Sequence, residues 1–300
     1  MAKARAIVKR RKAVRNIRKI TKTMQMIATA KFQKSLKRAV ATKPYTKKVR
    51  ELVAELASSL GESVEHPLLR QPNAATASHR IALIVLSSNR GLAGAYNGSV
   101  LRAAKSFFAQ QEAAGNKIDL FVSGKKGVSF FNFQKRPITK RYDQFGDLPA
   151  FAEVERVANE FMKAFIDGQY DAVYVAYMNF ISAGLQKPEV ATLLPLSSVS
   201  ATDAAAKQGR FKVATVYDFY PSAKELLDEL LPQTVKAQLF QFFLDATTSE
   251  NVARMIAMKS ATDNADKMVK SLTMEYNRAR QSQITTELSE IMGGVEAMNG

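Results

Sequence analysis

The segment ATDNADKMVKSLTMEYNRA, residues 261–279, decides the fold class because its small and apolar side chains recur at helical intervals. Successive positions are separated by four, three, four, four and three residues: Ala261, Ala265, Met268, Leu272, Tyr276 and Ala279. Side chains with this spacing share one face of a helix, and such a pattern over more than about 25 residues is typical of a coiled coil. The segment therefore predicts one helix of a coil, with alanines that allow its partner to approach closely.

The helical pattern extends in both directions from this segment. Neither Pro nor Gly occurs between residues 233 and 292, so the sequence predicts an uninterrupted helix about 90 Å long at ~1.5 Å per residue. Pro232 is expected to kink the start of this helix, and Gly293-Gly294 to end it. We assign the C-terminal coiled-coil helix to residues 221–294.

A second apolar stripe runs through the N-terminal segment, residues 1–60. Its positions again follow helical spacing: Val14, Ile17, Ile20, Met24 and Ile27. A stripe resumes after Pro44, so we expect a helix from about residue 3 to residue 58, bent near that proline. The two terminal helices are expected to pair as a long antiparallel coiled coil.

The residues between the helices, 78–200, have a different pattern. The apolar run IALIVL at 81–86 is typical of a buried strand, and a Gly-containing loop and a helix at 98–113 follow it. Further strands are expected at 118–122, 172–177 and 190–196, with a helix at 151–166. Alternating strands and helices predict a central α/β domain with a mostly parallel sheet.

Positive charge is concentrated at one end of the chain. The formal net charge is +17, yet residues 1–50 contain 18 Lys or Arg and no Asp or Glu, which leaves the other 250 residues near neutrality. Such a segment is typical of contact with nucleic acid, an anionic membrane or an acidic protein surface. A nucleic-acid-binding protein with a basic helical arm is therefore an alternative. An organelle targeting peptide would be rich in Ser, whereas Ser35 is the only one in this segment.

Motifs for catalysis or cofactor binding are incomplete. The chain has no Cys, and His66 and His79 lack enough companion ligands for zinc. Gly124-Lys125 resembles the end of a P-loop, but Asp119 and Lys126 occupy positions that require Gly and Ser or Thr. The spacing of Gly91, Gly94 and Gly98 differs from the dinucleotide fingerprint and favours a tight turn. We expect no catalytic, cofactor or metal residues, and no transmembrane helix.

Three segments resemble the gamma subunit of F-type ATP synthases. They are IRKITKTMQMIATA at 17–30, SSNRGLAGAYN at 87–97, and SATDNADKMVKSLTMEYNRARQSQITTELSEIMGG at 260–294. The third is the most distinctive. Asn89 and Ala93 depart from the residues commoner in that family, and no cysteine-bearing insert like that of the chloroplast form is present.

The resemblance implies a function. In that family the terminal helices form a rotor shaft inside a ring of alpha and beta subunits, and the α/β domain binds the epsilon subunit and faces the membrane c-ring. Catalysis takes place on the beta subunits, so this chain is expected to couple proton translocation to ATP synthesis without a cofactor or catalysis of its own. The expected location is peripheral, on the cytoplasmic face of a bacterial inner membrane.

The resemblance also implies contact residues. It places Met24 near an acidic helical arm of a beta subunit, with Lys19, Lys22 and Lys31 as sources of favourable charge. It places four polar residues of the last helix against beta-subunit loops during rotation: Arg280, Gln281, Thr285 and Glu287. Neither nucleic acid nor direct membrane insertion is expected.

Overall fold

The computed structural model describes residues 2–60, 66–71, 79–196 and 223–299. The chain divides into two compact units. Residues 1–30 and 254–300 form one, here called the coil unit, and residues 31–253 form the other, here called the sheet unit. The outer ends of the expected 78–200 and 221–294 segments lie outside the described residues.

Two long helices contribute to both units. Helix α1 spans Ala2–Leu60 and contains Pro44, as the apolar stripes predicted. Helix α6 spans Ala223–Asn299 and is therefore longer than expected. Gly293 and Gly294 lie within α6, so the predicted stop at these glycines is wrong. A glycine in a helix interior destabilises the helix by only about 1 kcal/mol relative to Ala. A Cβ at either position would meet open space, so packing does not require the helix to end there.

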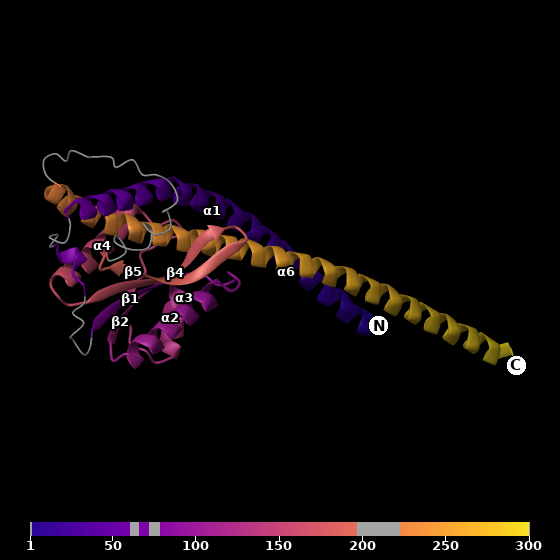
Figure 1. Ribbon diagram of the computed structural model, residues 1–300. Coiled ribbons are helices and arrows are strands. Elements are labelled where there is room, and N and C mark those ends of the chain that lie inside the picture. Colours follow the sequence, from indigo (N-terminus) through magenta and orange to yellow (C-terminus); the bar gives the residue numbers. More distant parts are fainter. Residues whose placement is uncertain (1, 61–65, 72–78, 197–222, 300) are drawn as a thin grey trace, which may run out of the picture. The chain divides into compact units, whose positions relative to one another are not determined.

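The sheet unit is built on five strands in the order β3-β2-β1-β4-β5 (Figure 1). The strands are β1 (Arg80–Leu86), β2 (Lys117–Ser123), β3 (Lys140–Tyr142), β4 (Ala172–Ser182) and β5 (Leu185–Leu194). β1 pairs in parallel with β2 and β4, and β2 pairs in parallel with β3. Only β5 is antiparallel, in a hairpin with β4, so the expected mostly parallel sheet is confirmed.

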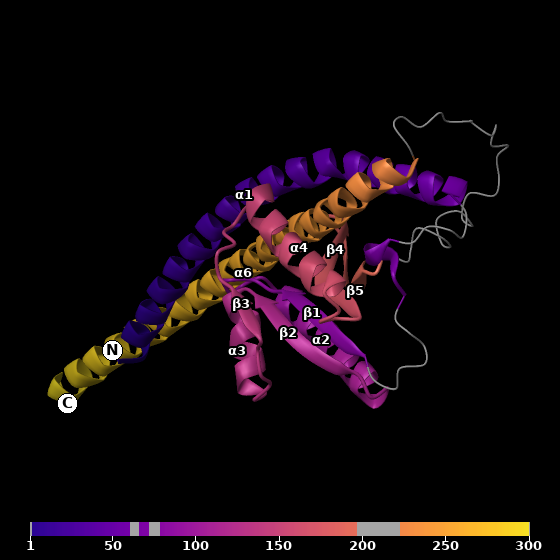
Figure 2. The ribbon, with the colours of Figure 1, turned by 90° about the vertical axis from the view of Figure 1, so that its left-hand side faces the viewer.

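Helices cover both faces of this sheet. The short helical elements are η2 (Pro67–Leu69), α2 (Tyr96–Ala113), α3 (Lys125–Phe133) and α4 (Phe151–Ile166). Alternate residues of β1 point to opposite faces, with Leu83 and Val85 packed against α2 and α3. Ala82 and Ile84 pack on the other face with α4, the first part of α6 and the second half of α1. Figure 2 shows α4 and α2 on opposite sides of the strands.

The sequence predicted four of the five strands but missed β3 and α3. Both elements are short, three and nine residues, which leaves little room for a periodic pattern. Long-range packing stabilises them instead. Phe131 of α3 is fully buried, and Tyr142 of β3 stacks on Phe121 of β2 with ring centroids 6.3 Å apart.

Candidate functional site: an exposed face of the coil unit

The two helices of the coil unit are antiparallel. Arg11 lies over the ring of Tyr276, Arg18 forms an ion pair with Asp266, and Thr262 donates a hydrogen bond of 2.8 Å to the hydroxyl of Thr21. Partner numbers on α6 thus fall as those on α1 rise. The expected antiparallel coiled coil is confirmed in this unit.

The coil interface contains only part of the predicted set: Val14 on α1, and Ala265, Leu272, Tyr276 and Ala279 on α6. On α1 the buried positions repeat every seven residues: Ile7, Val14, Thr21 and Ala28. On α6 the buried and half-buried positions alternate by four and three: Met258, Thr262, Ala265, Val269, Leu272, Tyr276 and Ala279. These are coiled-coil spacings, and small side chains predominate near the Thr21–Thr262 hydrogen bond.

The larger apolar residues of the predicted stripe lie outside this interface. Ile17, Ile20 and Ile27 are each more than half exposed, Met24 is half-buried, and Met268 on α6 is exposed. The assignment of these residues to the coil interface was therefore wrong, whereas that of Val14 was correct. The small side chains at 21 and 28 allow close helix approach, and the hydrogen bond between the two threonines satisfies their hydroxyls. The isoleucines consequently form an apolar face on the outside of α1.

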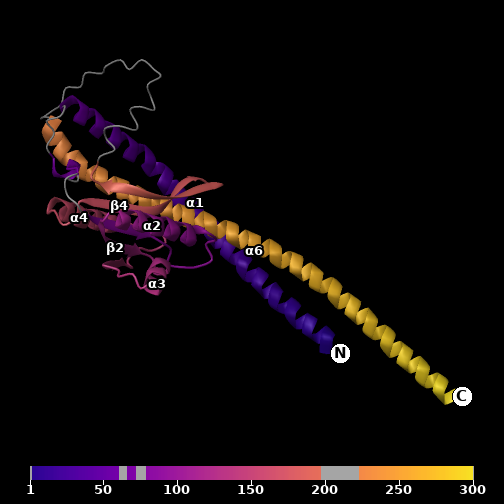
Figure 3. The same ribbon diagram turned by 60° about the horizontal axis from the view of Figure 1, so that its bottom comes forward.

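A second exposed apolar stripe covers the end of α6. Helix α6 extends past the N-terminal end of α1 (Figure 3). On this extension five large apolar side chains recur at spacings of four, three, four and three, all more than half exposed: Ile284, Leu288, Ile291, Val295 and Met298. The coil interface would continue through Gln283 and Thr286, which precede Ile284 by one residue and Leu288 by two, so the new stripe lies about 100–200° further around the helix.

The four polar residues named from the resemblance border this stripe. At about 100° per residue, Arg280 and Glu287 lie along one side of it, and Gln281 and Thr285 along the other. All four are exposed. Glu287 accepts a hydrogen bond of 2.8 Å from Gln283, whereas Arg280 has no hydrogen bond or ion pair within the described part of the chain. An apolar strip with a polar border has the anatomy of a protein interface.

One predicted charge contact is already used elsewhere. Lys31 belongs to the sheet unit, where its ammonium group donates to Asp147 at 2.6 Å. Lys31 was expected to attract an acidic partner, but its charge already has a partner within the chain, so it is less suited to that role than Lys19 and Lys22. Lys19 and Lys22 are exposed on the coil unit and remain suited to an acidic partner.

The P-loop-like residues have a structural role. Gly124 has φ +95°, and a Cβ there would lie 2.1 Å from the carbonyl oxygen of Ser87. The first amides of α3 are bonded within the chain: Lys125 N–H to Asn89 Oδ1, and Gly127 N–H to Ser87 Oγ. The amides that would bind phosphate in a P-loop therefore already have acceptors.

The histidines also have local contacts. His66 Nδ1 accepts from the Leu68 amide at 3.1 Å and caps η2, and burial lowers the pKa of its ring despite the nearby Asp228. His79 lies 3.8 Å from Asp171. Among residues 2–60, 66–71, 79–196 and 223–299, no three potential metal ligands cluster, and no helix is both long and apolar enough to cross a bilayer.

Comparisons with known proteins identify the family to which the chain belongs. Residues 3–298 match the profile of the protein family described as ATP synthase. The chain is 45% identical over 300 residues to the ATP synthase gamma chain of Rhodopirellula baltica, with 100% of both chains covered. The chain belongs to the ATP synthase gamma chain family. This gamma chain is therefore the rotor subunit of the central stalk of an F-type ATP synthase.

Other relatives agree with this assignment. The gamma chain of Leptospira biflexa strain Patoc 1 is 38% identical over 299 residues, with 100% of each chain covered. The fold is also similar to a chain in the Euglena gracilis mitochondrial ATP synthase OSCP/F1/c-ring structure, with a TM-score of 0.63 and 16% identity. That match covers 99% of this chain and 95% of the other.

The sequence reasoning missed the apolar stripe at the end of α6. The sequence analysis names only polar contact residues after Ala279, and these come from the resemblance. The signal was nevertheless present, since residues 284–298 keep the four–three spacing with a change of phase of one to two residues. A search for apolar periodicity that allows phase changes would have found it.

Proposed function

We propose that this gamma chain couples proton translocation through a membrane c-ring to ATP synthesis on beta subunits, and that it has no catalytic activity alone. The observation that carries the proposal is the exposed stripe at the end of α6 with its polar border. Such a surface is costly to leave in water, so it is suited to a socket formed by other proteins. A shaft whose end turns in such a socket can bias the conformation of each surrounding subunit in turn.

The proposed partners follow from the two units. The coil unit carries the apolar faces of α1 and α6, and we assign it to the alpha and beta subunits. We assign the sheet unit to the epsilon subunit and the c-ring, which places the protein peripherally on the cytoplasmic face of a bacterial inner membrane. Support comes from the full-length relationship to gamma chains and from the similar fold of a chain in the Euglena gracilis structure, which includes F1 and a c-ring.

The test is assembly with purified alpha and beta subunits. Ile291→Ser removes an exposed apolar side chain from the stripe, and Ile256→Ser makes the same change at another exposed position of the coil unit. Burying one such side chain stabilises by about 1.5–3 kcal/mol, so Ile291→Ser should weaken incorporation by roughly tenfold or more. Ile256→Ser should assemble as the parent does.

Activity measurements complete the test. The parent chain alone should not hydrolyse ATP, and the assembled complex should. Turnover by the pure chain would overturn the non-catalytic role. Failure to assemble, combined with salt-dependent binding to DNA, would favour a nucleic-acid-binding protein with a basic arm instead.

A further inference from the structure

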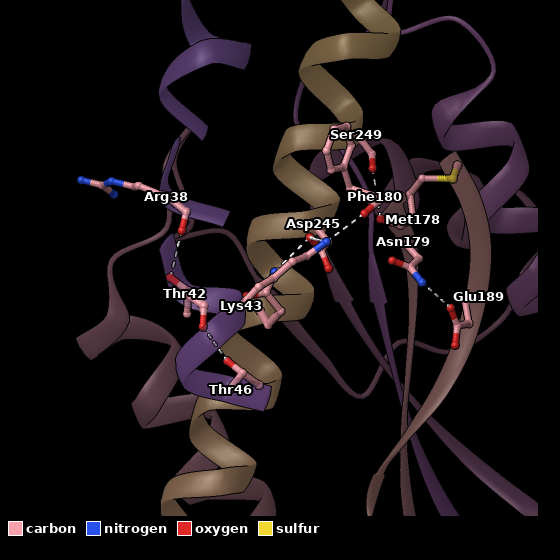
Figure 4. Close-up of polar contacts among 11 residues, drawn as sticks. Arg38, Thr42, Lys43, Thr46, Met178, Asn179, Phe180, Glu189, Asp245 and Ser249 are labelled. Atoms are coloured by element: carbon pink, nitrogen blue, oxygen red, sulfur yellow. Dashed lines mark hydrogen bonds and ion pairs between the residues drawn. The ribbon is translucent and has the colours of Figure 1, made fainter. Parts of the chain in front are cut away.

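A buried carboxylate joins three elements of the sheet unit (Figure 4). Asp245 of α6 is only 4% exposed. One of its oxygens accepts a hydrogen bond of 3.0 Å from Gln241 Nε2 and lies 3.7 Å from the ammonium nitrogen of Lys43, on α1. The same ammonium group donates to the carbonyl oxygen of Phe180, on β4, at 3.0 Å. One lysine thus contacts both α6 and the sheet.

The local structure of β4 presents that carbonyl. The register between β4 and β5 shifts between Phe180 and Ser182, which is an irregularity of the bulge type. Bulges re-aim backbone groups away from the ladder. The ring of Phe180 adds two contacts to α1: its centroid lies 5.9 Å from the Lys43 ammonium and 6.1 Å from the centroid of Phe32.

The surroundings of Asp245 do not favour its charge. Burial raises the pKa of its carboxyl group to about 6, although Lys43 and Gln241 act to lower it. Glu189 of β5 also raises it, and burial likewise raises the pKa of Tyr177, on β4 near Asp245. Arg50 of α1 acts on Tyr177 in the opposite direction. Lys43 is thus the cation that directly contacts Asp245.

The carboxylate of this ion pair is buried and the Lys43 side chain is 44% exposed, so the pair contributes little to stability, because desolvation of Asp245 offsets the Coulomb attraction. Its best-attested use is to select one arrangement of packed helices, because any other arrangement leaves a buried charge unpaired. We propose that Lys43 and Asp245 are a positioning pair that fixes α1 against α6 and β4, so that the sheet unit and its part of the shaft turn as one body. The functional half of this inference rests on the proposed rotor function.

The experiment separates positioning from stability. The double variant Lys43→Met/Asp245→Asn removes both charges in the full chain. At pH 8 its thermal midpoint should equal or exceed that of the parent, because no buried charge remains. Hydrogen exchange of the α1 amides at residues 31–60 should nevertheless become about tenfold faster. A tenfold change corresponds to the loss of an interaction free energy equal to about one pKa unit.

A matched control lies one turn further along α1. Lys47 pairs with Glu51 at 3.9 Å, with both side chains exposed, so Lys47→Met/Glu51→Gln should exchange as the parent does. Unchanged exchange in the first double variant, or a lower midpoint with uniformly faster exchange, would overturn the positioning role. Where the double variant folds poorly, Asp245→Asn alone serves, with the same expected result.

The assembled complex tests the functional half. A probe on the sheet unit should show wider angular fluctuation during ATP-driven rotation for Lys43→Met/Asp245→Asn than for the control pair. Equal fluctuation would overturn the transmission role while leaving the exchange result standing. If the parent complex does not rotate, the proposed function itself fails, which is a distinguishable outcome.

Discussion

The sheet unit and the coil unit use apolar residues in opposite ways. In the sheet unit most large apolar side chains are enclosed, with Phe108, Phe131, Phe161 and Phe165 all less than 2% exposed, although a few such as Phe133 are exposed. In the coil unit the buried hydrophobic cluster contains Ile7, Val14, Ala265 and Leu272, while many larger side chains remain exposed. The sheet unit therefore completes its own core, whereas the coil unit leaves apolar surface that other proteins can cover.

The largest effect should come from truncating the core of the sheet unit. Phe161 is 1% exposed and packs edge-on against Phe121, with centroids 4.8 Å apart. Phe161→Ala should lower the free energy of unfolding by about 3–5 kcal/mol through lost burial and a residual cavity. Thermal or urea denaturation of the full chain measures this loss.

Ile20→Ala is the matched change in the coil unit. Ile20 is 59% exposed, so its truncation should change stability by less than about 0.5 kcal/mol. Incorporation into the complex should fall instead. Equal destabilisation by the two variants would break the contrast between the units.

The second prediction concerns pH and the sheet unit. The folded pKa of Asp245 is about 6, above its ordinary value of 3.8, so the folded state holds the proton more tightly than the unfolded state. Protonated Asp245 has no charge-burial cost, and the cost grows as pH rises from about 3.8 to about 6. Across this pH window, ionisation of Asp245 should lower the free energy of unfolding by about 3 kcal/mol, as an order of magnitude.

Asp245→Asn isolates this effect, because it removes the titrating group and keeps a similar shape. Relative to the parent, the variant should gain stability as pH increases through this window and then level off above it. Denaturation of both proteins at pH 4.5, 6 and 8 gives the comparison. A difference that is constant with pH would show that Asp245 does not titrate as described.

The two units also differ in how much the sequence predicted. The strand at 81–86 and the helix at 151–166 were found accurately, because each has a strong apolar pattern that buries locally. The coil helices were found, and four of the six predicted α6 positions lie at the interface, but on α1 only Val14 of the predicted stripe does. Periodicity shows which residues share a face, whereas the choice between Ile20 and Thr21 depended on how closely α6 approaches and on the Thr21–Thr262 hydrogen bond.

The candidate site was predictable only in part. Arg280, Gln281, Thr285 and Glu287 came from the resemblance, and whether they touch a partner stays a prediction. The apolar stripe that they border has a periodic signal in the sequence, but its exposure depends on where α1 ends relative to α6. The Lys43–Asp245 contact could not be predicted, because 202 positions separate the two residues and neither lies in a motif.

The third prediction tests the polar border of the stripe. Arg280→Ala/Gln281→Ala should slow ATP hydrolysis by the assembled complex by about an order of magnitude, if each residue loses a hydrogen bond contributing ~1 kcal/mol. The helix content of the isolated chain should be unchanged by circular dichroism. Glu275→Ala/Ser282→Ala is the control, since both exposed positions lie about 160–180° from Ile284 around the helix. Similar slowing by both pairs would argue against a specific role for the border.

The smallest effect should follow from a single new charge on α1. Met24 is half-buried, and its long side chain can be replaced by Lys with the ammonium group directed to solvent. If an acidic arm of a beta subunit lies opposite, Met24→Lys adds an ion pair contributing only ~0–1 kcal/mol, but one that must break at each rotor step. The number of protons pumped per ATP hydrolysed should therefore fall at matched assembly.

Met26→Lys supplies the control for that charge, because Met26 is exposed on the same helix and points about 200° away from Met24. It adds the same charge to the already basic segment without directing it at the same partner. Coupling should be reduced by Met24→Lys and retained by Met26→Lys, with the difference narrowing at high salt as the ion pair is screened. Equal losses of coupling would show that net charge on the coil unit matters rather than the position of Met24. No loss in either variant would show that no acidic arm lies opposite this face of α1.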